Sequence, residues 1–178
     1  MMAFVFWDAE SVIFIDHLSK GQTISANYYS NLFHDLPDAI AEKRLGNSER
    51  GVIMLHDNAL PHTSRIALQV LEDCGFEVLS HPHYSPGSAP SHYYLFPQLK
   101  RQLRGKKFAT SYDVIDAITE WCNSQDPSLS QNGIIDLRHR WPKCVELQGN
   151  YVERFQSMNL HCRLPSDQAK NFSVTPSN

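Results

Sequence analysis

The segment Leu55-His56-Asp57-Asn58-Ala59-Leu60-Pro61-His62 places a carboxylate directly after a short apolar run that begins at Gly51. A run of this length, followed by turn-forming residues, is typical of a buried strand. A second segment, Tyr84-Ser85-Pro86-Gly87-Ser88-Ala89-Pro90-Ser91-His92-Tyr93-Tyr94-Leu95-Phe96, begins as a rigid proline-rich loop and continues with helical spacing. Residues 58–91 separate Asp57 from His92. These two side chains are the first candidates for a functional site.

Apolar periodicity predicts the elements around these two segments. Two apolar runs joined by a polar turn indicate a hairpin, Met1 to Trp7 with Val12 to Ile15. A helix is predicted from Ala26 to Leu45, which Pro37 kinks or splits, and a second helix is capped by Thr63 or Ser64. A strand follows from Phe76 to Leu79. Three later helices are predicted at Ser91 to Leu103, from Ser111 onward, and at Ile134 to Val145. This order predicts a mixed α/β fold.

Length and composition fit one globular domain of 178 residues, with 42% hydrophobic and 20% charged residues. The net charge of −3 excludes a global basic field, so a nucleic-acid partner would need a local basic patch. No apolar run approaches the length of a membrane span. Met1 to Trp7 lacks a basic flank, so we interpret it as a strand and not as a signal peptide. The pattern fades after Glu153, which predicts a folded domain over 1–153 and a disordered tail over 154–178.

Several further motifs occur in one order along residues 1–153. They are Phe6-Trp7-Asp8, Gly21-Gln22-Thr23, Glu42-Lys43-Arg44, His81-Pro82, Gly105-Lys106-Lys107-Phe108, His139-Arg140-Trp141 and Gly149-Asn150-Tyr151-Val152-Glu153. Together with the two segments quoted first, this series resembles the catalytic domain of mariner-type transposases of the Tc1/mariner superfamily. A similar segment is also found fused to a SET domain.

This resemblance implies an RNase H-like fold of the DDE/DDD transposase type, with strand order 3-2-1-4-5. On that template the hairpin supplies strands 2 and 3, Gly51 to His56 is strand 4, and Phe76 to Leu79 is strand 5. We expect the central first strand, which carries the first catalytic carboxylate, to lie outside this chain. The edges of Met1 to Trp7 and Gly51 to His56 would then pair directly or stay open, with marginal stability and self-association as the consequence.

The family's chemistry uses Mg²⁺ or Mn²⁺ held by three carboxylates. The resemblance makes Asp57 the second carboxylate and puts His92 where the third is expected. Imidazole is a softer ligand than Mg²⁺ prefers. We therefore expect Asp57 to bind a hydrated metal weakly if at all, with no tightly bound cofactor and with transposition lost.

A basic cluster consists of Lys100, Arg101, Arg104, Lys106 and Lys107. The resemblance implies that this face approaches the DNA backbone, and each cation near a phosphate releases about one counterion. A solvated basic helix end explains the same residues equally well.

The sequence therefore predicts a nuclear, residual DNA-binding domain that binds weakly and without sequence preference. It predicts no membrane contact and no small-molecule substrate, and it leaves homodimerisation open. Two alternatives remain: a domesticated interaction scaffold, and a metal-dependent endonuclease with an altered site around Asp57. His81-Pro82-His83 lacks the ligand spacing of a zinc site, so hydrogen-bonded or solvated histidines are the preferred interpretation.

Overall fold

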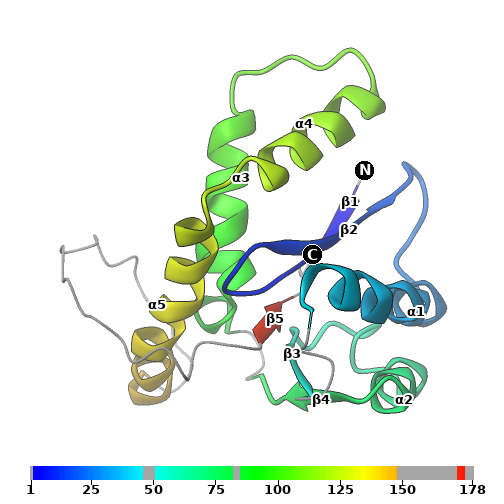
Figure 1. The fold of residues 1–178 in the computed structure, drawn as a ribbon, viewed down its shortest axis with the longest axis vertical. Coiled ribbons are helices and arrows are strands. Elements are labelled where there is room, and N and C mark those ends of the chain that lie inside the picture. Colours follow the sequence, from blue (N-terminus) through cyan, green and yellow to red (C-terminus); the bar gives the residue numbers. More distant parts are fainter. Residues whose placement is uncertain (1, 46–50, 82–84, 148–171, 175–178) are drawn as a thin grey trace.

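The computed structural model describes residues 2–45, 51–81, 85–147 and 172–174. The strands are β1 (Met2–Trp7), β2 (Val12–Leu18), β3 (Val52–Leu55), β4 (Phe76–Leu79) and β5 (Phe172–Val174). The α-helices are α1 (Ala26–Lys43), α2 (Arg65–Asp73), α3 (Phe96–Leu103), α4 (Ser111–Asn123) and α5 (Pro127–Glu146). A 3₁₀ turn (Pro86–Ser88) and a π-helical turn (Ser91–Leu95) lead into α3. Figure 1 shows the central sheet with helices on both sides.

The sheet confirms the predicted α/β class and the predicted places of four strands. Its order is β2-β1-β5-β3-β4. β1 and β2 form the antiparallel hairpin, with Met2 opposite Leu18 at one end. β3 and β4 are parallel and in register from Val52↔Phe76 to Leu55↔Leu79, with α2 as their crossover. If β5 is left aside, the order β2-β1-β3-β4 corresponds to the expected order of family strands 3, 2, 4 and 5.

The centre of the sheet differs from the expectation. β5 lies between β1 and β3, antiparallel to β1 and parallel to β3. The sequence predicted that β1 and β3 either pair directly or leave a gap open, and neither is the case. It also predicted a tail without regular structure over 154–178, but 172–174 form a strand. The physical reason is that two facing rows of unpaired backbone groups accept any extended segment that reaches them. A strand of three residues within a polar stretch is too short to show an alternation of apolar and polar residues, so the sequence pattern does not predict it.

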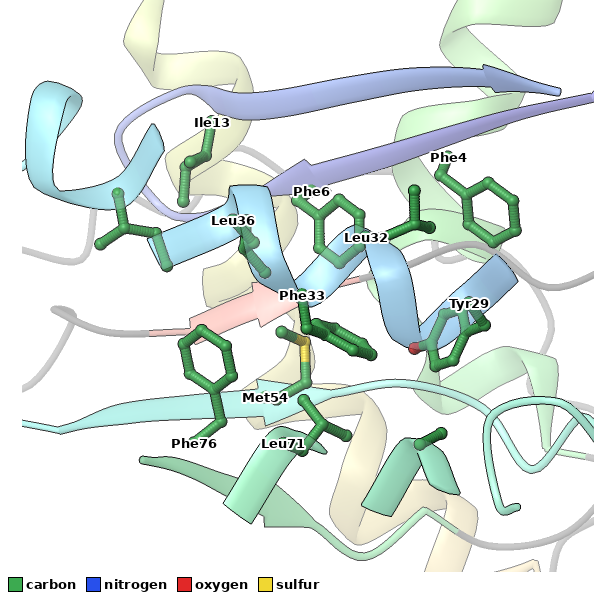
Figure 2. Close-up of a cluster of buried hydrophobic side chains, with 12 residues drawn as sticks. Phe4, Phe6, Ile13, Tyr29, Leu32, Phe33, Leu36, Met54, Leu71 and Phe76 are labelled. Carbon is green, nitrogen blue, oxygen red and sulfur yellow. The ribbon is translucent and has the colours of Figure 1, made fainter. Parts of the chain in front are cut away.

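Alternation along β1 builds two hydrophobic cores, one on each face of the sheet. Phe4 and Phe6 point to the core under α1 and α2, which Figure 2 shows with Phe33 and Met54 between helix and strand. Val5 and Trp7 point to the opposite core, which α3, α4 and α5 cover. Because consecutive side chains of a strand alternate between its faces, β1 is buried on both sides. Such double burial is typical of an inner strand.

Local capping sets where the helices begin, and it moves some predicted boundaries. Ser64 caps α2 as expected. Thr110, and not Ser111, caps α4 through a capping box with Asp113. α5 begins at Pro127, a turn and more before the predicted start, because Asp126 caps it there. Pro37 lies inside α1 without splitting it. None of the helices in the described part of the chain is long and apolar enough to cross a membrane.

Candidate functional site

Asp57 is the second residue beyond the end of β3, where the chain turns toward α2. Its Oδ1 accepts a hydrogen bond from the backbone N–H of Ala59 (3.1 Å) and lies 2.6 Å from Nδ1 of His62. His62 is 2% exposed, and its ring stacks on Tyr29 at a centroid distance of 4.0 Å. Burial raises the pKa of Asp57, but the hydrogen bonds from His62 and Ala59 and the charges of His62 and His92 together outweigh it and hold the pKa below its ordinary value. Asp57 is therefore an ionised carboxylate whose orientation is set by His62.

The π-helical turn places His92 close enough to Asp57 for the carboxylate to raise the pKa of His92. Trp7 Nε1 on β1 donates to Ser91 Oγ at 3.0 Å, which fixes the start of this turn against the sheet. Nε2 of His92 is buried and has no hydrogen-bond partner. Burial lowers the pKa of His92, Asp57 raises it, and Lys100 lowers it, with a net shift downward. The fold thus brings together the two residues that the sequence singled out, and His92 is a neutral imidazole near neutral pH.

Two more histidines surround this pair. His56 is 5% exposed, and neither of its ring nitrogens has a hydrogen-bond partner. Burial, with a contribution from His62, lowers the pKa of His56 to about 4. His81 Nε2 lies 3.1 Å from Ser88 Oγ in the proline-rich loop. His83, part of the His81-Pro82-His83 motif, lies outside the described residues.

The donor set at Asp57 does not fit Mg²⁺. In the described ranges, no group of three or more histidine, cysteine, aspartate or glutamate side chains is placed to hold a metal ion. Oδ1 of Asp57 is already engaged by His62 and Ala59, and the neighbour that could add a donor is an imidazole. Mg²⁺ prefers oxygen ligands in near-octahedral geometry. One carboxylate and one imidazole do not supply them.

The basic cluster divides into two parts in the structure. Lys100 and Arg101 lie on the last turn of α3, and Arg104 caps its end. These three residues line a groove of about 950 Å³ whose other wall is α5. Lys106 and Lys107 are exposed and lie beyond Gly105, where a φ of +79° turns the chain away.

Sequence reasoning missed the contribution of α5 to this groove. Arg140 donates from Nε to the carbonyl of Gly87 at 2.7 Å, and its guanidinium lies 4.3 Å from the ring centroid of Tyr93. Tyr93 in turn donates to the carbonyl of Gly133 at 2.7 Å. α5 therefore anchors the loop at Gly87 and the π-helical turn that carries His92. The sequence signal for this contact was the motif His139-Arg140-Trp141, which indicated resemblance to the family but not that Arg140 contacts Gly87 and Tyr93.

Comparison with known proteins agrees with this architecture. A family model described as "Transposase (partial DDE domain)" matches residues 1–50. The chain is 37% identical over 154 residues to the Mariner Mos1 transposase of Drosophila mauritiana, covering 85% of this chain and 45% of that protein. It is 36% identical over 154 residues to human histone-lysine N-methyltransferase SETMAR, covering 86% of this chain and 22% of that protein.

A solved structure of the Mos1 transposase catalytic domain, with raltegravir and Mg, matches with a TM-score of 0.81 at 37% identity; the match covers 85% of this chain and 76% of that one. The chain belongs to the mariner transposase family. The predicted family and its RNase H-like fold are thereby confirmed. This mariner-type domain spans less than half the length of the two curated relatives it matches.

Proposed function

We propose that this mariner-type domain binds DNA in the nucleus but does not cut or join it in Mg²⁺. The observation that carries the proposal is that His92, an imidazole, lies within electrostatic range of Asp57 where the family resemblance calls for a second carboxylate. Mos1 structures have been solved with Mg, with Mn and as a paired-end complex. By homology, the ancestor of this domain used such a metal on DNA.

The central strand supports the same proposal. In the family resemblance this strand carries the first carboxylate. Here the strand in that position is Phe172-Ser173-Val174, which contains no acidic residue. Two-metal catalysis needs oxygen ligands on both sides of the scissile phosphate to hold the two ions. Asp57 alone offers too few of them.

DNA binding rests on the exposed basic cluster, Lys100 to Lys107, in a chain whose net charge is −3. A local group of cations on an otherwise acidic molecule attracts the phosphate backbone only at short range. We therefore propose binding that is weak, independent of sequence and strongly dependent on salt.

A plasmid-nicking assay tests the catalytic half of this proposal. We expect no nicking in Mg²⁺ by the purified protein, under conditions where Mos1 transposase cleaves its own ends. Robust Mg²⁺-dependent nicking that disappears in Asp57→Ala would contradict the proposal. Nicking in Mn²⁺ alone, also lost in Asp57→Ala, would support the alternative of an endonuclease with an altered metal preference.

Fluorescence anisotropy with labelled DNA tests the binding half. Replacing all five cluster cations with alanine should reduce affinity about equally for unrelated sequences, because phosphate contacts carry no sequence information. The slope of log K against log salt should fall by about one for each cation that contacts a phosphate. Binding that resists high salt or selects one sequence would contradict the proposal, and capture of protein partners without DNA binding would favour the scaffold alternative.

A further inference from the structure

The groove between α3 and α5 differs in its lining from a surface that contacts only phosphates. Its volume of about 950 Å³ is recessed and lined by aromatic and apolar side chains as well as by cations. The groove is open along one side, so it would contact a ligand along part of its surface.

The α3 wall supplies the positive charge. Lys100, Arg101 and Arg104 are exposed and face the groove. Lys100 is also close enough to His92 to lower the pKa of that histidine, so the groove borders the candidate site around Asp57. A phosphodiester lying on this wall would meet three cations within one helical turn and its cap.

The floor supplies aromatic surface, and it is preformed. Tyr93 is held by its hydrogen bond to Gly133, and the guanidinium of Arg140 covers one face of its ring, so a base could stack only on the opposite face. Tyr94 packs against the same glycine, since a Cβ added at Gly133 would lie 2.7 Å from its Cδ1 atom. Pro97 continues the apolar surface along α3. Bases stack on such surfaces only when they are unpaired, because a base pair hides both faces in the duplex stack.

The α5 wall adds one acceptor to this cationic groove. Asp136 lines it one turn before Arg140. A carboxylate repels phosphate, so the backbone of a ligand is directed to the α3 wall. The amino and imino groups of a nucleobase are the donors that a carboxylate accepts. Arg140 also lines the α5 wall, but its guanidinium is buried against Gly87 and Tyr93. The exposed cations therefore lie on the α3 wall and the exposed carboxylate lies on the α5 wall, which separates a phosphate side from a base-edge side.

We propose that this groove binds unpaired nucleotides of single-stranded DNA, with phosphates on Lys100, Arg101 and Arg104 and a base edge toward Asp136. This inference rests on the proposed DNA binding and names the form of DNA that the site selects. It places single-stranded DNA next to the pair Asp57 and His92.

Two double variants of equal charge change test the proposal. Lys100→Ala/Arg104→Ala removes two cations that line the groove, whereas Lys106→Ala/Lys107→Ala removes two exposed cations that lie outside its lining. Each is measured by anisotropy with a labelled 20-nucleotide single strand and with the matching duplex, at one fixed salt concentration.

We expect the unchanged protein to bind the single strand at least 10-fold more tightly than the duplex. The groove variant should lose most of that preference, and the outer variant should keep it while weakening both substrates alike. Asp136→Asn should reduce the preference for the single strand with little change in duplex affinity. Circular dichroism confirms that each variant is folded.

Duplex affinity equal to or tighter than single-strand affinity, with both lowered by the outer variant, would overturn this inference and leave the proposed DNA binding intact. Equal loss of the preference in both double variants would also overturn it. Absence of binding to either substrate would overturn both proposals together.

Discussion

His56 packs beside the stacked rings of Tyr29 and His62, at centroid distances of 6.2 and 5.6 Å, and its two ring nitrogens lack hydrogen-bond partners. Burial lowers its pKa from 6.5 to about 4, so the folded state keeps it neutral while the unfolded state takes up a proton. The resulting stability is complete above pH 6.5 and is lost as the pH falls toward 4. The size of this contribution is about 3 kcal/mol. We predict that His56→Phe flattens the loss of stability between pH 7.5 and pH 4.5, measured by urea unfolding.

His34→Phe is the matched control, because His34 is exposed on α1 and should leave the pH dependence unchanged. Some acid sensitivity should persist in His56→Phe, since the pKa of His92 is also lowered by burial. An unchanged pH profile in His56→Phe would show that this ring is solvated in the folded protein. His56→Phe should also be at least as stable as the parent at pH 7.5, because it removes two buried nitrogens without partners.

β5 is the element on which the sheet depends most for its continuity. Ser173 lies opposite Met54, and Val174 lies opposite both Leu55 and Trp7, so this short strand joins the hairpin to the parallel pair. Proline at 173 removes a backbone N–H and is poorly tolerated inside a sheet. We predict that Ser173→Pro lowers the free energy of unfolding by about 1–3 kcal/mol, the cost of a buried backbone group left unpaired. Thermal and urea unfolding measure it.

Ser173→Thr is the control, because it keeps the N–H and favours an extended backbone. A chain ending at Val174 should match the parent, whereas one ending at Asn171 should lose stability and associate through the open edges, as size-exclusion chromatography with light scattering would show. If all four proteins unfold alike as monomers, β5 contributes nothing to the sheet in solution.

The whole domain is two cores on one sheet. Leu71 lies in the core under α1 and α2, and Leu137 lies in the core under α3 to α5, while β1 contributes to both. A shared strand couples the two cores, so we predict one cooperative unfolding transition. Leu71→Ala and Leu137→Ala should each lower the free energy of unfolding by about 2–5 kcal/mol and shift the same midpoint.

Leu60→Ala serves as the control, because Leu60 is 87% exposed and its loss should change stability by less than about 0.5 kcal/mol. Two separate transitions, with each variant moving a different one, would show that the cores fold independently. Denaturation followed by both tryptophan fluorescence and circular dichroism distinguishes these cases.

Prediction from sequence was most accurate where the signal is local. The parallel pair β3 and β4, the hairpin and the Ser64 cap follow from apolar runs and turn residues that lie within a few positions of one another. The start of α5 was missed because Asp126-Pro127 precedes a polar stretch that does not show the helical period. Asp57 and His92 were selected from sequence. The hydrogen bond between His62 and Asp57 was not, because His62 is positioned by stacking on Tyr29 of α1, and sequence spacing does not reveal that contact.

The sequence by itself determined the family, the α/β class and the absence of a carboxylate at His92, because these depend on residue identity and local pattern. Tertiary structure alone decided that Phe172–Val174 completes the sheet and that α5 packs against the π-helical turn at Tyr93 and Tyr94. Both outcomes come from contacts between segments far apart in the chain. Their free energy comes from pairing backbone groups and burying surface that neither segment can satisfy alone.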